Sequence, residues 1–142
     1  MKKAYQNYKR TLESLRDFPL LFFRLILAYG FYQPAVNKFK DFQAIADWFS
    51  SMNYPVPLVS AYAAGITEML GVILLTLGVG TRIIALPLII VMLVAIFTVH
   101  ISNGFAAGDN GFEIPLYYIL MLFALMVYGS GRISIDYFLH RK

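Results

Sequence analysis

Two ionisable side chains lie in stretches that are otherwise apolar. Glu68 lies in "AAGITEMLG", and no other charged residue occurs between Leu58 and Gly80. Arg24 interrupts a second apolar stretch, which begins near residue 19. A carboxylate and a guanidinium can hydrogen-bond a polar ligand or exchange protons, and each is costly to bury without a partner. We therefore predict that Glu68 pairs with Arg24, either as a structural ion pair or as part of a ligand site.

A second group of polar residues occurs near the ends of the apolar stretches. It comprises Lys38, His100 and Glu113, with Gln33, Asn37 and Asp109 nearby. Each has a simple explanation, since a lysine suits a helix C-terminus and a glutamate a helix N-terminus. Together, however, they indicate a site for an ion, a ligand or a partner protein on one surface. We expect Lys38, His100, Glu113 and Gln33 to contribute to such a site.

Several kinds of redox chemistry are excluded by composition. The chain has no cysteine, so disulfides, thiolate relays and iron–sulfur ligation are ruled out. The two histidines, His100 and His140, are expected at opposite ends of the molecule, which excludes a haem held between two histidines. "GSGR" at residues 129–132 lacks the third glycine and the context of a phosphate-binding loop. We predict no metal site.

The elements that must position these residues are membrane spans. The chain is 59% hydrophobic and only 14% charged, whereas soluble domains contain about a quarter charged residues. Four apolar segments run roughly over 19–38, 58–78, 82–102 and 113–130, each near the ~20 residues that cross a bilayer as a helix. We predict an all-α integral-membrane four-helix bundle, with residues 1–142 forming a single domain.

The charge distribution predicts the orientation. The net charge of +4 comes mostly from both ends of the chain: Lys2, Lys3, Lys9, Arg10, Arg16, Arg132, Arg141 and Lys142. Clustered cations of this kind flank cytoplasmic membrane surfaces, so the charge does not indicate nucleic-acid binding. We expect a multi-pass protein of the bacterial inner membrane with both termini in the cytoplasm.

Short helices are expected outside the spans, and one span has a face of small residues. Apolar residues from Tyr5 to Leu15, and again from Phe42 to Phe49, repeat at helical spacing, which predicts two helices lying at the membrane surface. Small residues share the helix face of Glu68, where they would let a neighbouring helix approach closely: Ala61, Ala64, Gly65, Gly71 and Gly78.

Several of these segments together resemble the DoxX family of small four-helix bacterial membrane proteins. They are "FRLILAYGF", "NKF", "ITEMLGVILLTLGVGTR", "VMLVAIFTVH" and "GSGRISID", and the resemblance covers about residues 20–137. The chain departs from the common pattern in "FYQPAVNK", where many members have a glycine before the lysine, and at Ser130, where proline is frequent. "NGFEIPLYY" and the Tyr-x-Pro-Ala variant resemble a subgroup found beside pathways that make copper-binding modified peptides.

The resemblance implies redox work in the membrane, with redox or sulfur-metabolism enzymes as partners. The polar positions that match the family are Arg24, Lys38, Glu68, His100, Glu113 and Asp136. We expect a component of a redox complex that binds a quinone or a similar amphipathic molecule and contacts membrane lipid, alone or as a homo-oligomer, with Glu68 and Arg24 at the head group. The alternatives are a non-catalytic scaffold for a partner enzyme or peptide pathway, and a transporter of a small solute or a metal.

Overall fold

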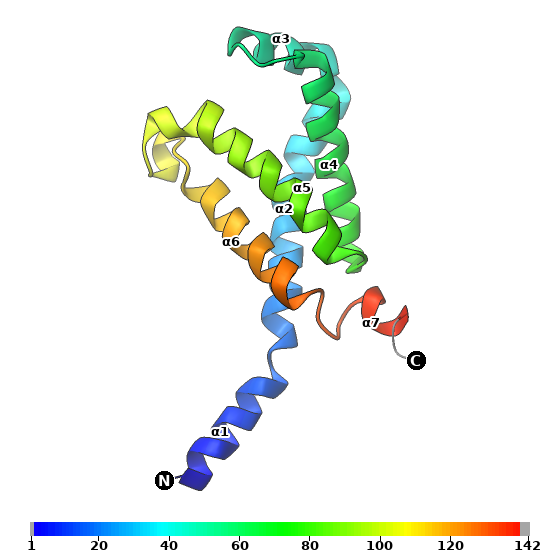
Figure 1. Cartoon of the computed structure of the whole chain (residues 1–142), viewed down its shortest axis with the longest axis vertical. Coiled ribbons are helices and arrows are strands. Elements are labelled where there is room, and N and C mark those ends of the chain that lie inside the picture. Colours follow the sequence, from blue (N-terminus) through cyan, green and yellow to red (C-terminus); the bar gives the residue numbers. More distant parts are fainter. Residues whose placement is uncertain (1, 140–142) are drawn as a thin grey trace.

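The structure, a computed structural model, describes residues 2–139 and consists of helices and loops. The main bundle is formed by α2 (Asp17–Lys40), α4 (Pro57–Leu77), α5 (Thr81–Ala95) and α6 (Glu113–Tyr128) (Figure 1). No strand occurs within the described range, so the predicted all-α fold is confirmed. His140, Arg141 and Lys142 of the expected basic tail lie outside the described residues.

Three helical segments are long and apolar enough to cross a membrane. They are Lys3–Lys40, Pro57–Leu77 and Thr81–Asn103, which makes the chain a multi-pass membrane protein. The fourth predicted span corresponds to α6, which has 16 residues. At ~1.5 Å per residue α6 is about 24 Å long, shorter than the ~30 Å hydrocarbon layer.

The core lies where α2, α4, α5 and α6 meet. Fully buried leucines from all four helices form its centre: Leu27, Leu75, Leu88, Leu122 and Leu125. The expected small-residue face of α4 lies against its neighbours. A Cβ on Gly65 would lie 2.8 Å from Phe42, and one on Gly71 would lie 2.8 Å from Leu88. The absence of side chains at these glycines is what allows the close approach.

The two ends of the bundle differ in their covering. At one end, here called the α3 end, α3 (Phe42–Ser51) lies across the tops of α2 and α4 and buries Ala46 and Phe49 (Figure 1). The opposite end, here called the termini end, contains the start of α2, the turn after α4, and the 129–134 loop leading to α7 (Ile135–Leu139). The N-terminal segment predicted to lie at the membrane surface forms a helix, α1 (Lys2–Ser14), which extends away from the bundle.

The helix that begins as α5 changes its winding near the α3 end. It continues as a π-helical turn, Ile96–His100, and then as a short 3₁₀ turn, Ile101–Asn103. The backbone N–H of Ile101 donates to the carbonyl of Ile96, five residues earlier. Toward this end α5 diverges from α4 (Figure 1), which leaves space between the two helices for the site described next.

Candidate functional site

Glu68 pairs with Lys38 and not with Arg24. The Lys38 Nζ donates to both carboxylate oxygens of Glu68, at 3.0 Å to Oε1 and 2.9 Å to Oε2. The Glu68 side chain is 4% exposed and the Lys38 side chain 14%. The predicted Arg24–Glu68 pair is therefore wrong, although the prediction that Glu68 is buried against a cation is confirmed.

The register of α2 against α4 explains the difference. Arg24 and Lys38 lie on the same helix about 21 Å apart along its axis, so only one of them can reach Glu68. The missing Cβ of Gly65 brings the α2 backbone close to α4 at Lys38, whose Cβ lies 3.2 Å from where a Cβ on Gly65 would be. Gly65 precedes Glu68 by one helical turn, so Lys38 is the cation placed beside the carboxylate.

Arg24 instead lies at the termini end. Its Nη2 donates to the backbone carbonyl of Ile133, in the loop after α6. The side chain is 1% exposed, and a Cβ on Gly78 would collide with its Nη1. Nε and Nη1 are buried without a hydrogen-bond acceptor among the described residues. Arg24 thus attaches the C-terminal loop to the bundle, away from Glu68.

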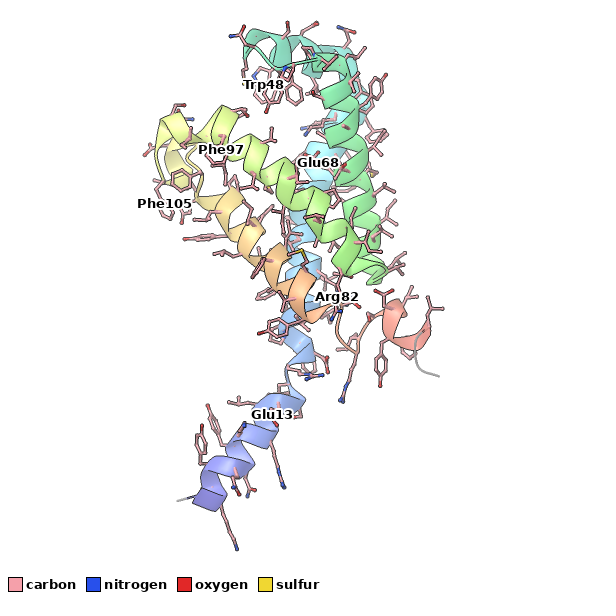
Figure 2. All side chains as sticks on the ribbon, in the orientation of Figure 1. Glu13, Trp48, Glu68, Arg82, Phe97 and Phe105 are labelled. Carbon is pink, nitrogen blue, oxygen red and sulfur yellow. The ribbon has the colours of Figure 1, made fainter. Side chains whose placement is uncertain are left out.

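A cavity of about 920 Å³ lies beside the Lys38–Glu68 pair, between α4 and α5 and beneath α3. Lys38, Glu68 and His100 all line it. Figure 2 shows Glu68 near α2 and α4, and Trp48 on the side of α3 that faces α5. Most of the wall is apolar or aromatic, including Phe31, Trp48, Phe49, Ala64, Ile90 and Val94.

Two further features lie at the cavity wall. Gly30 lines the cavity, and because residue 34 is proline, no N–H four residues later pairs with its carbonyl. The Tyr54 hydroxyl and the Thr98 Oγ1 lie 2.5 Å apart and join the segment before α4 to the π-helical turn. Sequence reasoning missed both features; the proline within α2 was the available signal for the first.

The expected polar group at the α3 end separates into two parts. His100 lines the cavity with Lys38, and its Nδ1–H donates to the Asn110 carbonyl at 2.8 Å. Glu113, by contrast, accepts from the Ala107 N–H at 2.9 Å and from the Tyr117 hydroxyl at 3.0 Å.

Gln33 is exposed and donates to Asn37, at 2.8 Å, on the same helix. Neither Glu113 nor Gln33 lines the cavity. Among the described residues, no three His, Asp or Glu side chains are close enough together to hold a metal ion.

The chain is similar to several known proteins. Two proteins of Haemophilus influenzae, both named only as uncharacterized, are 32% and 33% identical to it, over 82% and 89% of this chain and 80% and 94% of their own lengths. A Bacillus subtilis (strain 168) protein named "Putative oxidoreductase CatD" is 27% identical over 85% of this chain and 87% of its own length. No solved structure shows significant similarity to the chain.

The family profile that matches is that of DoxX, over residues 19–101. The match contains the whole of α4 and both members of the Lys38–Glu68 pair. It covers more than half of the sequence, and the chain therefore belongs to the DoxX family.

Proposed function

We propose that the protein is an inner-membrane component of a redox complex and binds a quinone, or a similar amphipathic redox molecule, in the cavity beside Lys38 and Glu68. The observation that supports this is a buried ion pair in the wall of an otherwise apolar cavity. The cavity volume, about 920 Å³, falls within the ~300–1,000 Å³ typical of small-molecule sites. Apolar walls suit a ring and prenyl tail, and the ion pair suits polar ring oxygens.

The ion pair can hydrogen-bond either redox form of such a ligand. An ammonium group has three N–H donors, and two directions of the Lys38 Nζ are taken by Glu68. The third is available to a ring carbonyl. The Glu68 carboxylate accepts hydrogen bonds, so it can receive a ring hydroxyl. Glu68 is also the group placed to take a proton from that hydroxyl.

Electron transfer would need a partner. A bound quinol, when oxidised, supplies two electrons and two protons. The chain has no cysteine with which to accept those electrons. The Bacillus subtilis relative has an oxidoreductase name, which supports redox work in this family. We therefore assign this chain the binding of the redox molecule and the handling of its protons, and an associated enzyme the onward electron transfer.

Both termini of the chain would face the cytoplasm. The start of α2, the turn after α4 and the loop after α6 all lie at the termini end, joined by the hydrogen bonds of Arg24 and Asp136. Among the described residues, every lysine and arginine except Lys38 and Lys40 lies at this end or on α1, which favours a cytoplasmic location. Reporter fusions at either terminus should be active only as cytoplasmic reporters, and a cysteine introduced at Asn53 should react with an impermeant reagent from outside.

The test of quinone binding uses matched pairs of variants. Purified protein is extracted for bound quinone, and quinone-free protein is then titrated with short-chain ubiquinone and menaquinone analogues. Glu68→Gln and Lys38→Met should each weaken quinone binding about tenfold or more, because each removes one charge-assisted hydrogen bond to the ligand. Glu113→Gln and Lys40→Met make the same chemical changes outside the cavity and should leave affinity unchanged.

Two outcomes would contradict the proposal. One is that neither analogue binds and no quinone is extracted. The other is that all four variants bind as the native protein does. Copurification of a partner enzyme without quinone would then favour the non-catalytic scaffold.

A further inference from the structure

A second groove, of about 1060 Å³, lies at the termini end and is separate from the cavity beside Glu68. It is bounded by the starts of α2 and α5, the end of α6 and the loop that follows α6. Three arginines line it: Arg16, Arg82 and Arg132. The groove also contains the Gly129–Ser130–Gly131–Arg132 segment, which the proposed function does not use.

The three arginines lie at the boundaries of the apolar helices. Arg16 directly precedes α2, Arg82 is the second residue of α5, and Arg132 lies in the loop beyond α6. In a protein that crosses a bilayer, this is the depth of the lipid head groups. Figure 2 shows the Arg82 side chain between the end of α6 and α7.

Among the residues that the structure describes, the positive charge of the groove is only partly balanced. Arg132 Nε lies 3.8 Å from Asp17 Oδ2, and the Arg132 backbone N–H donates to Asp17 Oδ1 at 3.0 Å. Arg82 donates to a neutral acceptor, the Val127 carbonyl, at 3.3 Å. Within residues 2–139, no salt bridge joins Arg16 or Arg82 to a carboxylate.

The remaining acid of the groove, Asp136, is held by backbone and hydroxyl donors. It accepts from the Gly80 N–H at 3.1 Å and from the Ser130 hydroxyl at 3.4 Å. Three guanidinium groups therefore share the groove with two carboxylates that already receive hydrogen bonds from the protein. The local field favours an anion.

Apolar side chains of the membrane-spanning helices form another part of the groove wall. Leu20 and Phe23 of α2, Ile83 of α5 and Ala124 of α6 line it. Gly129 permits Arg82 to lie against the loop, because a Cβ there would be 3.1 Å from Arg82 Nε. A ligand that fits both parts must have an anionic head and a hydrocarbon chain.

We propose that this groove binds an anionic phospholipid, with the phosphate held by Arg82 and Arg132 and an acyl chain lying along Leu20 and Phe23. Arginine matches phosphate oxygens through paired N–H groups, and basic pockets between membrane helices are known to receive lipid head groups. The glycine-rich loop between α6 and α7 thus forms one wall of a lipid site.

The test uses the full chain in detergent after delipidation. Bound phosphatidylglycerol and phosphatidylcholine are counted by native mass spectrometry, and the midpoint of thermal unfolding is measured with each lipid and with inorganic phosphate. We expect retention of phosphatidylglycerol, with a higher midpoint than phosphatidylcholine gives. Arg82→Gln combined with Arg132→Gln should lower phosphatidylglycerol affinity about tenfold.

The control combines Lys9→Gln with Arg10→Gln, which removes the same charge from α1. It should keep the phosphatidylglycerol affinity of the native protein. Equal loss in both double variants would mean that general surface charge attracts the lipid, and would overturn the proposal. Equal stabilisation by inorganic phosphate alone would overturn it too, since no acyl chain would then be needed. If the groove variant folds poorly, Arg82→Lys provides the second measurement, and a weaker response to phosphatidylglycerol is expected because the paired N–H geometry is lost.

Discussion

The two ends of the bundle each bury a cation, but they provide different partners for it. At the α3 end, Lys38 binds both oxygens of a carboxylate, and a cavity lies beside the pair. At the termini end, Arg24 binds a backbone carbonyl, and its other buried nitrogens have no acceptor among the described residues. The first arrangement leaves polar groups facing a space. The second fastens a loop onto the bundle.

This comparison shows that burial of a charge does not by itself identify a ligand site. Arg24 is more buried than Lys38, yet Arg24 does not line the cavity. A charged group with a second polar partner and adjacent apolar space is the better candidate. Substitutions at the α3 end and at the termini end should therefore change different properties of the protein.

The largest effect is expected from Glu68→Ala. Removing the carboxylate leaves the Lys38 ammonium without its partner in a low-dielectric setting, which typically costs about 3–5 kcal/mol. The midpoint of thermal unfolding and the yield of monodisperse protein should both fall. Glu68→Leu combined with Lys38→Met should recover much of the loss, since the desolvation cost disappears with the charges.

The same measurement can separate Lys38 from Arg24 as the partner of Glu68. In Glu68→Leu combined with Arg24→Met, the loss in free energy of unfolding should be at least the sum of the losses in the two single variants. Contacting residues are energetically coupled, whereas distant ones add. Recovery of stability with Arg24→Met, in place of Lys38→Met, would contradict the ion pair described here.

A smaller effect is expected at the turn after α4. Gly78 and Gly80 both have left-handed backbone conformations, with φ of +68° and +56°. An added Cβ meets Arg24 at Gly78 and nothing within 4 Å at Gly80. Gly78→Ala should therefore lower the free energy of unfolding by about 1–3 kcal/mol more than Gly80→Ala, the usual cost of overpacking. Equal losses would mean that Arg24 adjusts freely.

Asp136→Asn should have a still smaller effect, confined to the termini end. Asp136 accepts from the Gly80 N–H, and its own N–H donates to the Gly78 carbonyl at 3.1 Å. The amide keeps one acceptor oxygen, so a loss of about 1–2 kcal/mol is expected. Quinone affinity should stay at the native value, and a fall in that affinity would show that the two ends are coupled.

The smallest effect on stability is expected from His100→Ala. The lost hydrogen bond to the Asn110 carbonyl contributes about 0.5–1.5 kcal/mol. His100 lines the cavity, however, so this variant should lower quinone affinity while Glu113→Gln does not. If both variants, or neither, changed quinone affinity, the separation of the expected polar group into two parts would have no functional meaning.

The sequence predicted the positions of the helices better than it predicted which charged side chains pair with each other. Long apolar segments define their own extent, and α4 (Pro57–Leu77) matches the span predicted from its hydropathy over 58–78. The face of Glu68 was also predictable, because glycine and alanine at helical spacing mark a close helix contact. Gly65 and Gly71 indeed lie against side chains of neighbouring elements.

The partner of Glu68 was not predictable from depth alone. Arg24 lies about six residues into the first predicted span and Glu68 about ten into the second, which puts the two at similar depths in the membrane. The axial register of the two helices, however, depends on where glycines let their backbones come close together. Gly65 sets the contact with α2 at Lys38. The loop after α6 provides the acceptor for Arg24, and it lies 109 residues further along the chain, beyond the reach of any local pattern.

The π-helical turn at Ile96–His100 determines the direction in which the His100 side chain points around the helix axis. In an α-helix each residue advances about 100° around the axis, so one residue added to a turn rotates all that follows by that angle. Relative to an uninterrupted α5, the side chains are rotated progressively across this turn, and those beyond it are rotated by about one residue step. In a family member lacking one residue here, the helix would keep regular α-helical winding, and the histidine would point at a different neighbour. In an alignment across residues 96–100, two aligned residues of the same type can therefore point in different directions.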